Sequence, residues 1–171
     1  SGLEHYFSHM WEMKALREGT AGDLHGIQVG VGTLLTLWIY EHLLNFDTVD
    51  RAKAEKAMAA FDPVAWEARC RQIFGLIAPQ IIALEEKAHK NDPQRHGERL
   101  DKLCASWPQI RQIIAEELPP REKIYALMQH AGMPLSPRDL GLTGADTAQA
   151  LVGSRDIRDK YLTSSMLWDL G

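Results

Sequence analysis

Residues 24–44 read LHGIQVGVGTLLTLWIYEHLL, a stretch that is apolar on nearly every side of a helix. Such a helix is buried on all sides, so we expect it at the centre of the fold. A membrane-spanning helix needs about 20 apolar residues, whereas glycines and threonines interrupt residues 29–40 and Glu41 and His42 follow them. We therefore predict a buried helix over residues 24–44 with Asp23 as its N-cap and with no membrane span. Gly26 and Gly30, one turn apart, are expected to allow another backbone or a ligand to come close.

The remaining sequence also favours helices. Apolar residues at 3, 6, 7, 10, 13 and 16 follow helical spacing, and the alternation typical of strands is absent from the chain. Together these patterns predict one all-α domain of about eight to ten helices over residues 1–171. The expected helices besides 24–44 cover residues 3–17, 47–60, 62–75, 79–89, 94–105, 108–117, 121–130, 147–153 and 160–170, with a single turn at 137–140.

Composition excludes some functions. Hydrophobic residues make up 45% of the 171 residues and charged residues 25%, as in ordinary globular proteins. The net charge of −4 argues against a nucleic-acid-binding protein, which would carry a basic face. Cys70 and Cys104 match no zinc or redox spacing, so we predict reduced thiols in a cytoplasmic protein.

Three of the seven histidines lie within the first 25 residues. His5 and His9 are four residues apart, so on a helix they point to one side and could share a ligand. Tyr6 stands where a zinc protease of this spacing needs its general-base glutamate, which argues against that class. His25 lies in the first turn of the central helix, where the helix dipole disfavours a charged imidazole. A neutral imidazole is the form that binds a metal.

The spacing alone also allows purely structural histidines. A catalytic zinc normally takes three protein ligands, and the nearby carboxylates Glu4, Glu12 and Asp23 are more simply solvated or capping residues. The other polar groups are predicted to be structural or exposed. His42 and His130 are expected to be structural, His89 and His96 exposed, and the mixed cluster Arg155, Asp156, Arg158, Asp159 and Lys160 a solvated face.

Two motifs carry a resemblance to a known family. The patterns SGxEHxxSHxWEM at residues 1–13 and LHGxQVGVGT at residues 24–33 resemble the sn-glycerol-1-phosphate dehydrogenases. These enzymes belong to the superfamily of iron-type alcohol dehydrogenases and glycerol dehydrogenases. The segments AGMP at 131–134, IRDKY at 157–161 and LWDLG at 167–171 are similar to the ends of those enzymes, while residues 47–118 resemble them weakly.

The resemblance implies a metal-binding domain of a larger enzyme. In the family an N-terminal α/β domain binds NAD or NADP, and a helical C-terminal domain supplies most of the metal site. His5 and His25 match the two histidine ligands of the metal, and His9 matches the histidine that contacts substrate. The resemblance implies zinc, with nickel or iron as alternatives. The family's aspartate ligand and its nucleotide-binding region lie upstream of these motifs, and this sequence contains neither.

We therefore expect the C-terminal half of a two-domain dehydrogenase that interconverts dihydroxyacetone phosphate and sn-glycerol 1-phosphate. Its partners would be a small phosphorylated triose and the missing nucleotide-binding domain, and the chain alone would be inactive. Apolar surface around Tyr6, Phe7 and Trp11 would be left exposed and could support a homo-oligomer. Two alternatives remain open: a dehydrogenase of another small polyol such as glycerol, and a non-catalytic helical interaction module.

Overall fold

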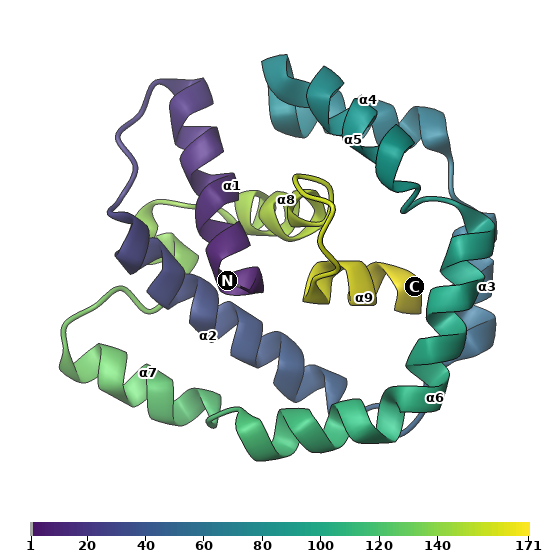
Figure 1. The fold of residues 1–171 in the computed structure, drawn as a ribbon. Helices are drawn as coiled ribbons and strands as arrows, with labels where there is room; N and C mark the ends of the chain where they lie inside the picture. Colours follow the sequence, from purple (N-terminus) through teal and green to yellow (C-terminus); the bar gives the residue numbers. More distant parts are fainter. Residues whose placement is uncertain (1) are drawn as a thin grey trace. The chain divides into compact units, whose positions relative to one another are not determined.

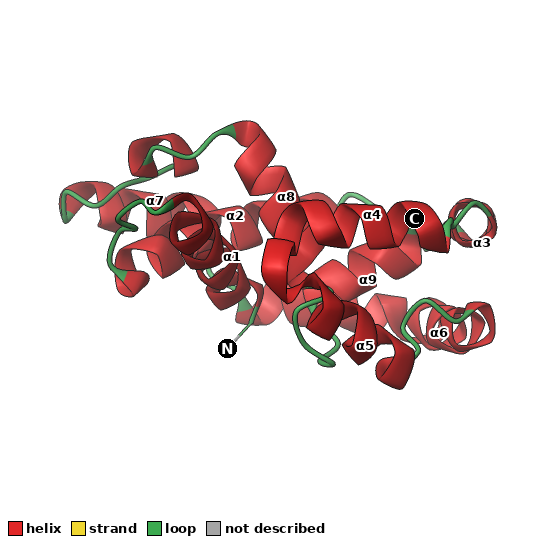
Figure 2. Cartoon of the chain, turned by 90° about the horizontal axis from the view of Figure 1, so that it is seen from above, coloured by secondary structure: helices red, strands yellow, loops and turns green. Residues whose placement is uncertain are grey.

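The computed structural model describes residues 2–171, and these residues form helices and no strand (Figure 2). The predicted all-α class is thus confirmed. None of the described helices is long and apolar enough to cross a membrane. The helices are α1 (Leu3–Glu18), α2 (His25–Leu43), α3 (Arg51–Ala59), α4 (Pro63–Phe74), α5 (Ala78–Ala88), α6 (Pro93–Glu117), α7 (Arg121–His130), α8 (Gly144–Ser154) and α9 (Thr163–Leu170), with 3-10 turns at Gly75–Ile77 and Pro137–Leu140.

The chain divides into two compact units. The first comprises the chain up to Phe46 together with Ile110–Ser154, and the second comprises Asp47–Gln109 and Arg155–Gly171. Helix α6 runs from the second unit into the first, and the boundary follows Pro108 closely.

Helix α6 departs from the sequence prediction, which placed a break between residues 105 and 108. Proline lacks a backbone N–H and crowds the preceding turn, so it usually ends a helix. Here the helix continues through Pro108. The apolar side chains on either side of the proline, Leu103, Trp107 and Ile114, are all buried. Their burial offsets the lost hydrogen bond, which is why local propensity misplaced this boundary.

In the first unit, α1 packs against α2 and α8, and α2 also packs against α7 (Figure 1). Tyr6, Phe7 and Trp11 are only 4%, 1% and 2% exposed, because α1 turns these side chains into the core of the unit. The expectation that they form an open apolar surface was wrong. These side chains are already covered by α2 and α8, against which α1 packs within the same unit.

The backbones of α1 and α2 approach each other closely at Gly32. A Cβ atom there would lie 2.6 Å from the carbonyl oxygen of Glu4, whereas a Cβ atom on Gly26 would meet nothing within 4 Å. Gly30 faces the side chains of Met133 and Met128 instead of another backbone. The glycine that permits the close helix contact is therefore Gly32, and not the Gly26–Gly30 pair that the sequence favoured.

Helix α2 begins without the predicted side-chain cap. Its N-cap residue is Leu24, and no side chain caps it. Asp23 contributes through its backbone carbonyl, which accepts a hydrogen bond of 3.3 Å from Nε2 of Gln28. His25 is consequently the first residue of the helix.

In the second unit, α4 packs beside α5, and α3 contacts α9. Asp62 caps α4 as expected, since its Oδ1 atom accepts hydrogen bonds from the backbone N–H groups of Val64 and Ala65. These local signals were visible in the sequence because the cap and the proline after it are adjacent in the chain.

Three polar residues of this unit are buried, contrary to prediction. His96, Arg155 and Asp156 are 3%, 4% and 6% exposed. The Arg155 guanidinium lies 4.1 Å from the ring centre of Trp168 and donates to Asp156. The alternation of charges around residue 155 suggested a solvated face, but pairing and ring contact allow two of these charges to be buried.

A glycine pair tests the helix contact. We expect Gly32→Ala to lower the free energy of unfolding by about 1–3 kcal/mol, because the new methyl group meets the backbone of Glu4 and neither helix can yield cheaply. The matched variant Gly26→Ala, in open space, should leave stability unchanged or raise it by up to about 1 kcal/mol. Urea denaturation of both variants measures this difference. Equal effects at the two positions would contradict the close contact.

The two cysteines should differ in reactivity. Both are free, and burial raises the pKa of the Cys70 thiol to about 12. Because the thiolate is the reactive form, Cys70 should resist thiol reagents in the folded protein at pH 8, while the half-buried Cys104 reacts. Mass spectrometry of the alkylated protein should find one modified cysteine before denaturation and two after it. Cys104→Ser should abolish the first modification.

Candidate metal centre

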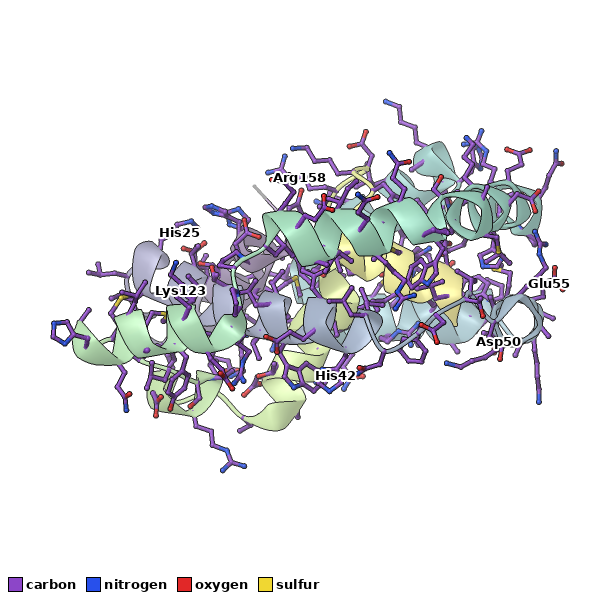
Figure 3. The ribbon with its side chains drawn as sticks, turned by 90° about the horizontal axis from the view of Figure 1, so that it is seen from below. His25, His42, Asp50, Glu55, Lys123 and Arg158 are labelled. Atoms are coloured by element: carbon purple, nitrogen blue, oxygen red, sulfur yellow. The ribbon has the colours of Figure 1, made fainter. Side chains whose placement is uncertain are left out.

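Helix α1 aligns four polar side chains on one face, and α2 places a fifth opposite them. His5, Ser8, His9 and Glu12 follow the spacing of three and four residues that keeps side chains on one side of a helix. His25, the first residue of α2, faces this row. Figure 3 shows His25 and His42 toward opposite ends of α2. The fold therefore brings together the three histidines that the sequence singled out.

Both ring nitrogens of His25 have partners. Its Nε2 atom lies 3.2 Å from Nδ1 of His5. Its Nδ1 atom lies 2.8 Å from Oε1 of Glu12 and 3.0 Å from Oγ of Ser8. Glu12 also reaches His9, with 3.3 Å between its Oε2 atom and Nδ1 of the ring. His25 is thus the centre of the cluster.

Glu12 decides which nitrogen of His25 carries the proton. An ionised carboxylate can only accept hydrogen bonds, so Nδ1 of His25 donates to it and the lone pair of the neutral ring lies on Nε2. That lone pair faces His5. Metal-binding histidines are commonly oriented by a carboxylate in this way.

The carboxyl group of Glu12 is held in its charged form. Burial alone would raise its pKa, but hydrogen bonds from His25 and His9 outweigh that effect and lower the pKa below its ordinary value. Glu12 therefore stays an acceptor for both rings near neutral pH.

The donor set fits a divalent transition metal. Two nitrogens on a tetrahedral zinc ion, each about 2.0–2.1 Å from it, are roughly 3.3–3.4 Å apart, and His5 Nδ1 and His25 Nε2 are 3.2 Å apart. A second possible set, the ligand atoms of His9, Glu12 and His25, lies within 4.8 Å of one another. Imidazole nitrogens and carboxylate oxygens suit zinc, nickel and iron.

The cluster is not a serine hydrolase triad, although it contains a serine, a histidine and a glutamate. In a triad the acid and the serine contact different ring nitrogens, whereas Ser8 and Glu12 both contact Nδ1 of His25. Ser8 is also fully buried, and its hydroxyl donates to Oε1 of Gln28 at 2.8 Å. Ser8 and Gln28 therefore link α1 to α2 and position His25.

Sequence reasoning missed part of this cluster. Glu12 was predicted to be solvated or capping, and Ser8 and Gln28 were not singled out as site residues. The available signal was the helical spacing of Ser8 and Glu12 relative to His5. Glu4, by contrast, keeps the local role expected of it, since its carboxylate accepts a hydrogen bond from the backbone N–H of Gly2.

Three curated proteins match the sequence, and all are named glycerol-1-phosphate dehydrogenase (NAD(P)+). The chain is distantly similar to these dehydrogenases. The protein of Geobacillus stearothermophilus is 27% identical over 146 residues, 83% of this chain and 26% of that protein. That of Geobacillus thermodenitrificans is 27% identical over 142 residues. That of Halalkalibacterium halodurans is 26% identical over 160 residues, 94% of this chain and 30% of that protein.

The similarity confirms the family resemblance carried by the histidine motifs. The chain spans between about a quarter and a third of the length of these relatives, so it corresponds to a domain of such a protein. No family model matches the sequence, and no solved structure matches it.

A glutamate pair tests the orienting role of Glu12. We expect Glu12→Gln to weaken zinc binding about tenfold or more, because the neutral amide holds His25 less firmly in the metal-binding tautomer. Glu18→Gln, which removes the same charge from α1 at an exposed ion pair with Lys14, should leave zinc affinity unchanged. Competition of each variant with a chromophoric chelator measures the affinities. An equal loss of zinc affinity in both variants would mean that Glu12 acts only through its contribution to the net charge.

Proposed function

We propose that this chain is the metal- and substrate-binding helical domain of an NAD(P)-linked glycerol-1-phosphate dehydrogenase. The whole enzyme would interconvert dihydroxyacetone phosphate and sn-glycerol 1-phosphate. The observation that carries this proposal is the contact of His25 with both His5 and Glu12, in a chain that is 26–27% identical to three proteins of that name.

In this proposal His5 and His25 hold the metal through Nδ1 and Nε2. Zinc is the expected ion, with nickel or iron as alternatives. Two histidines do not complete a catalytic site, so a further ligand would come from a part of the enzyme outside these residues. Glu12 acts through His25 as a positioning residue, and His5, which Glu12 does not contact, would coordinate the same ion.

A bound divalent cation would act as a Lewis acid toward the ketone oxygen of the substrate. His9 lies on the same face of α1, and its side chain is 44% exposed. Glu12 holds the Nδ1 edge of that ring, which leaves Nε2 to hydrogen-bond a substrate hydroxyl or to move a proton. The hydride would pass from a reduced nicotinamide to the carbonyl carbon while the oxygen gains a proton, and another domain would hold the nucleotide.

The chain by itself should be inactive under this proposal. Its described residues contain no strand followed by a glycine-rich turn and a helix, the unit that binds a dinucleotide. The partners would be the nucleotide-binding domain and a phosphorylated triose. Two free cysteines suit a reducing compartment, and we place the enzyme in the cytoplasm.

The decisive experiment uses the full-length product of the parent gene. Loaded with zinc, it should oxidise NADH or NADPH when dihydroxyacetone phosphate is added, and a chelator should stop the reaction. Glycerol with the oxidised cofactor serves as the comparison substrate, and preference for it would replace the proposed substrate by a simple polyol. A folded, zinc-loaded protein that turns over neither substrate would favour a non-catalytic interaction module.

Single histidine variants of the same protein separate the proposed roles. His5→Ala and His25→Ala should each lose stoichiometric zinc, measured by elemental analysis after gel filtration. His9→Ala should keep its zinc but lose at least about a hundredfold in kcat, the scale of a lost proton-transfer group. His42→Ala, at the other end of α2, should change neither. Loss of zinc in His9→Ala with retention in His5→Ala would assign the metal to the His9–Glu12–His25 set instead.

A further inference from the structure

The second unit contains a polar pocket that the dehydrogenase proposal does not use. Its volume is about 660 Å³, within the range of small-molecule sites. The first turns of α6, the segment before α9 and α9 itself contribute to its walls. Six cations line it: Lys90, Arg95, Arg99, Lys102, Arg155 and Lys160.

Three of the four carboxylates of the pocket wall have structural partners. Asp169, only 1% exposed, receives two hydrogen bonds from Arg99 at 2.7 and 2.8 Å and one from the hydroxyl of Tyr161 at 2.9 Å. Asp92 accepts from the backbone N–H of Arg95 at the start of α6. Glu98 accepts from Gln94. Asp159, the fourth carboxylate, forms no ion pair with a described residue. Arg155 is likewise paired, with Asp156.

Unlike Arg99 and Arg155, the other four cations of the pocket are not paired with a carboxylate in the described part of the chain. No carboxylate of the described residues forms an ion pair with Lys90, Arg95, Lys102 or Lys160. Lys90 is half-buried, and its ammonium donates to the backbone carbonyls of Arg155 and Arg158 at 2.6 and 2.7 Å. An ammonium has three donors, so one remains. Partly desolvated charge without an ion partner is costly, and a bound anion would offset that cost.

The start of α6 adds little to the positive potential of the pocket. The helix begins at Pro93, which has no N–H group, and the N–H of Arg95 already donates to Oδ1 of Asp92. The attraction for anions therefore comes from the lysine and arginine side chains that line the pocket.

We propose that this pocket binds a phosphorylated small molecule carrying at least two negative charges, through Lys90, Arg95, Lys102 and Lys160. The tetrahedral oxygens of a phosphate can accept from several cations at once, and these four come from α6, the turn before it and the segment before α9. The proposal requires no metal and does not rest on the dehydrogenase activity.

Inorganic pyrophosphate is the probe, titrated into the metal-free chain by calorimetry. We expect binding tighter than about 1 mM, weakened about tenfold or more in Lys102→Gln/Lys160→Gln, since each lysine lost removes a charge-assisted contact. The control Lys56→Gln/Lys123→Gln removes two exposed lysines from α3 and α7 and should bind like the original chain. Both tested lysines are surface groups, so the double variant should unfold at the same temperature as the original.

Several outcomes would overturn the proposal. Equal weakening in the control would mean attraction by net charge alone. Citrate binding as tightly as pyrophosphate would contradict the preference for phosphorylated ligands. A dissociation constant for pyrophosphate above about 1 mM would show that the pocket is not a binding site for it. Lys90→Met, checked for intact thermal unfolding, should lose binding as well. The pyrophosphate titration contains no metal, so its failure would leave the zinc experiments unaffected. Failure of the zinc experiments would likewise leave the proposed phosphate site untouched.

Discussion

The contact between α1 and α2 is the constraint on which the histidine cluster depends. Gly32 lets the two backbones meet at Glu4, and the buried hydroxyl of Ser8 joins the helices through Gln28. With the helices held at this separation, His25 lies within hydrogen-bond distance of both His5 and Glu12. A metal site tolerates displacements of only about half an ångström, so the packing around Gly32 determines the geometry of the histidines.

Sequence patterns predicted the features that depend on residues close together in the chain. Helical spacing placed His5 and His9 on one side of α1, and the apolar run after Asp23 marked α2. The role of Glu12 could not be predicted in this way, because it depends on a ring 13 residues away that only the helix pairing brings near. Pro108 misled the prediction of α6 because the burial of Trp107 and its neighbours, a tertiary effect, outweighs the local cost of proline.

In the second unit, the buried carboxylate of Asp169 holds the surrounding polar side chains in place, as the α1–α2 contact holds the histidines in the first. A carboxylate that is 99% removed from solvent is stable only when its lone pairs are satisfied, and Arg99 and Tyr161 satisfy them from two different segments. Burial and the neighbouring Asp169 also raise the pKa of Tyr161, so its hydroxyl remains a donor. Nε2 of the buried His96 donates to the backbone carbonyl oxygen of Asp169 at 3.0 Å. The sequence showed these residues as scattered polar groups, and their burial follows from one carboxylate near the chain's end.

The two histidines proposed as ligands, His5 and His25, provide fewer donors than a catalytic zinc requires, and Glu12 orients only His25 of the two. The matched relatives are between three and four times as long as the part that this chain spans. Under the proposed function, the half-exposed cluster on α1 would face another domain of the enzyme, and that domain would supply the remaining ligand. Metal affinity should therefore be a property of the assembled enzyme, since the third donor contributes both its own bond and the ordering of the first two.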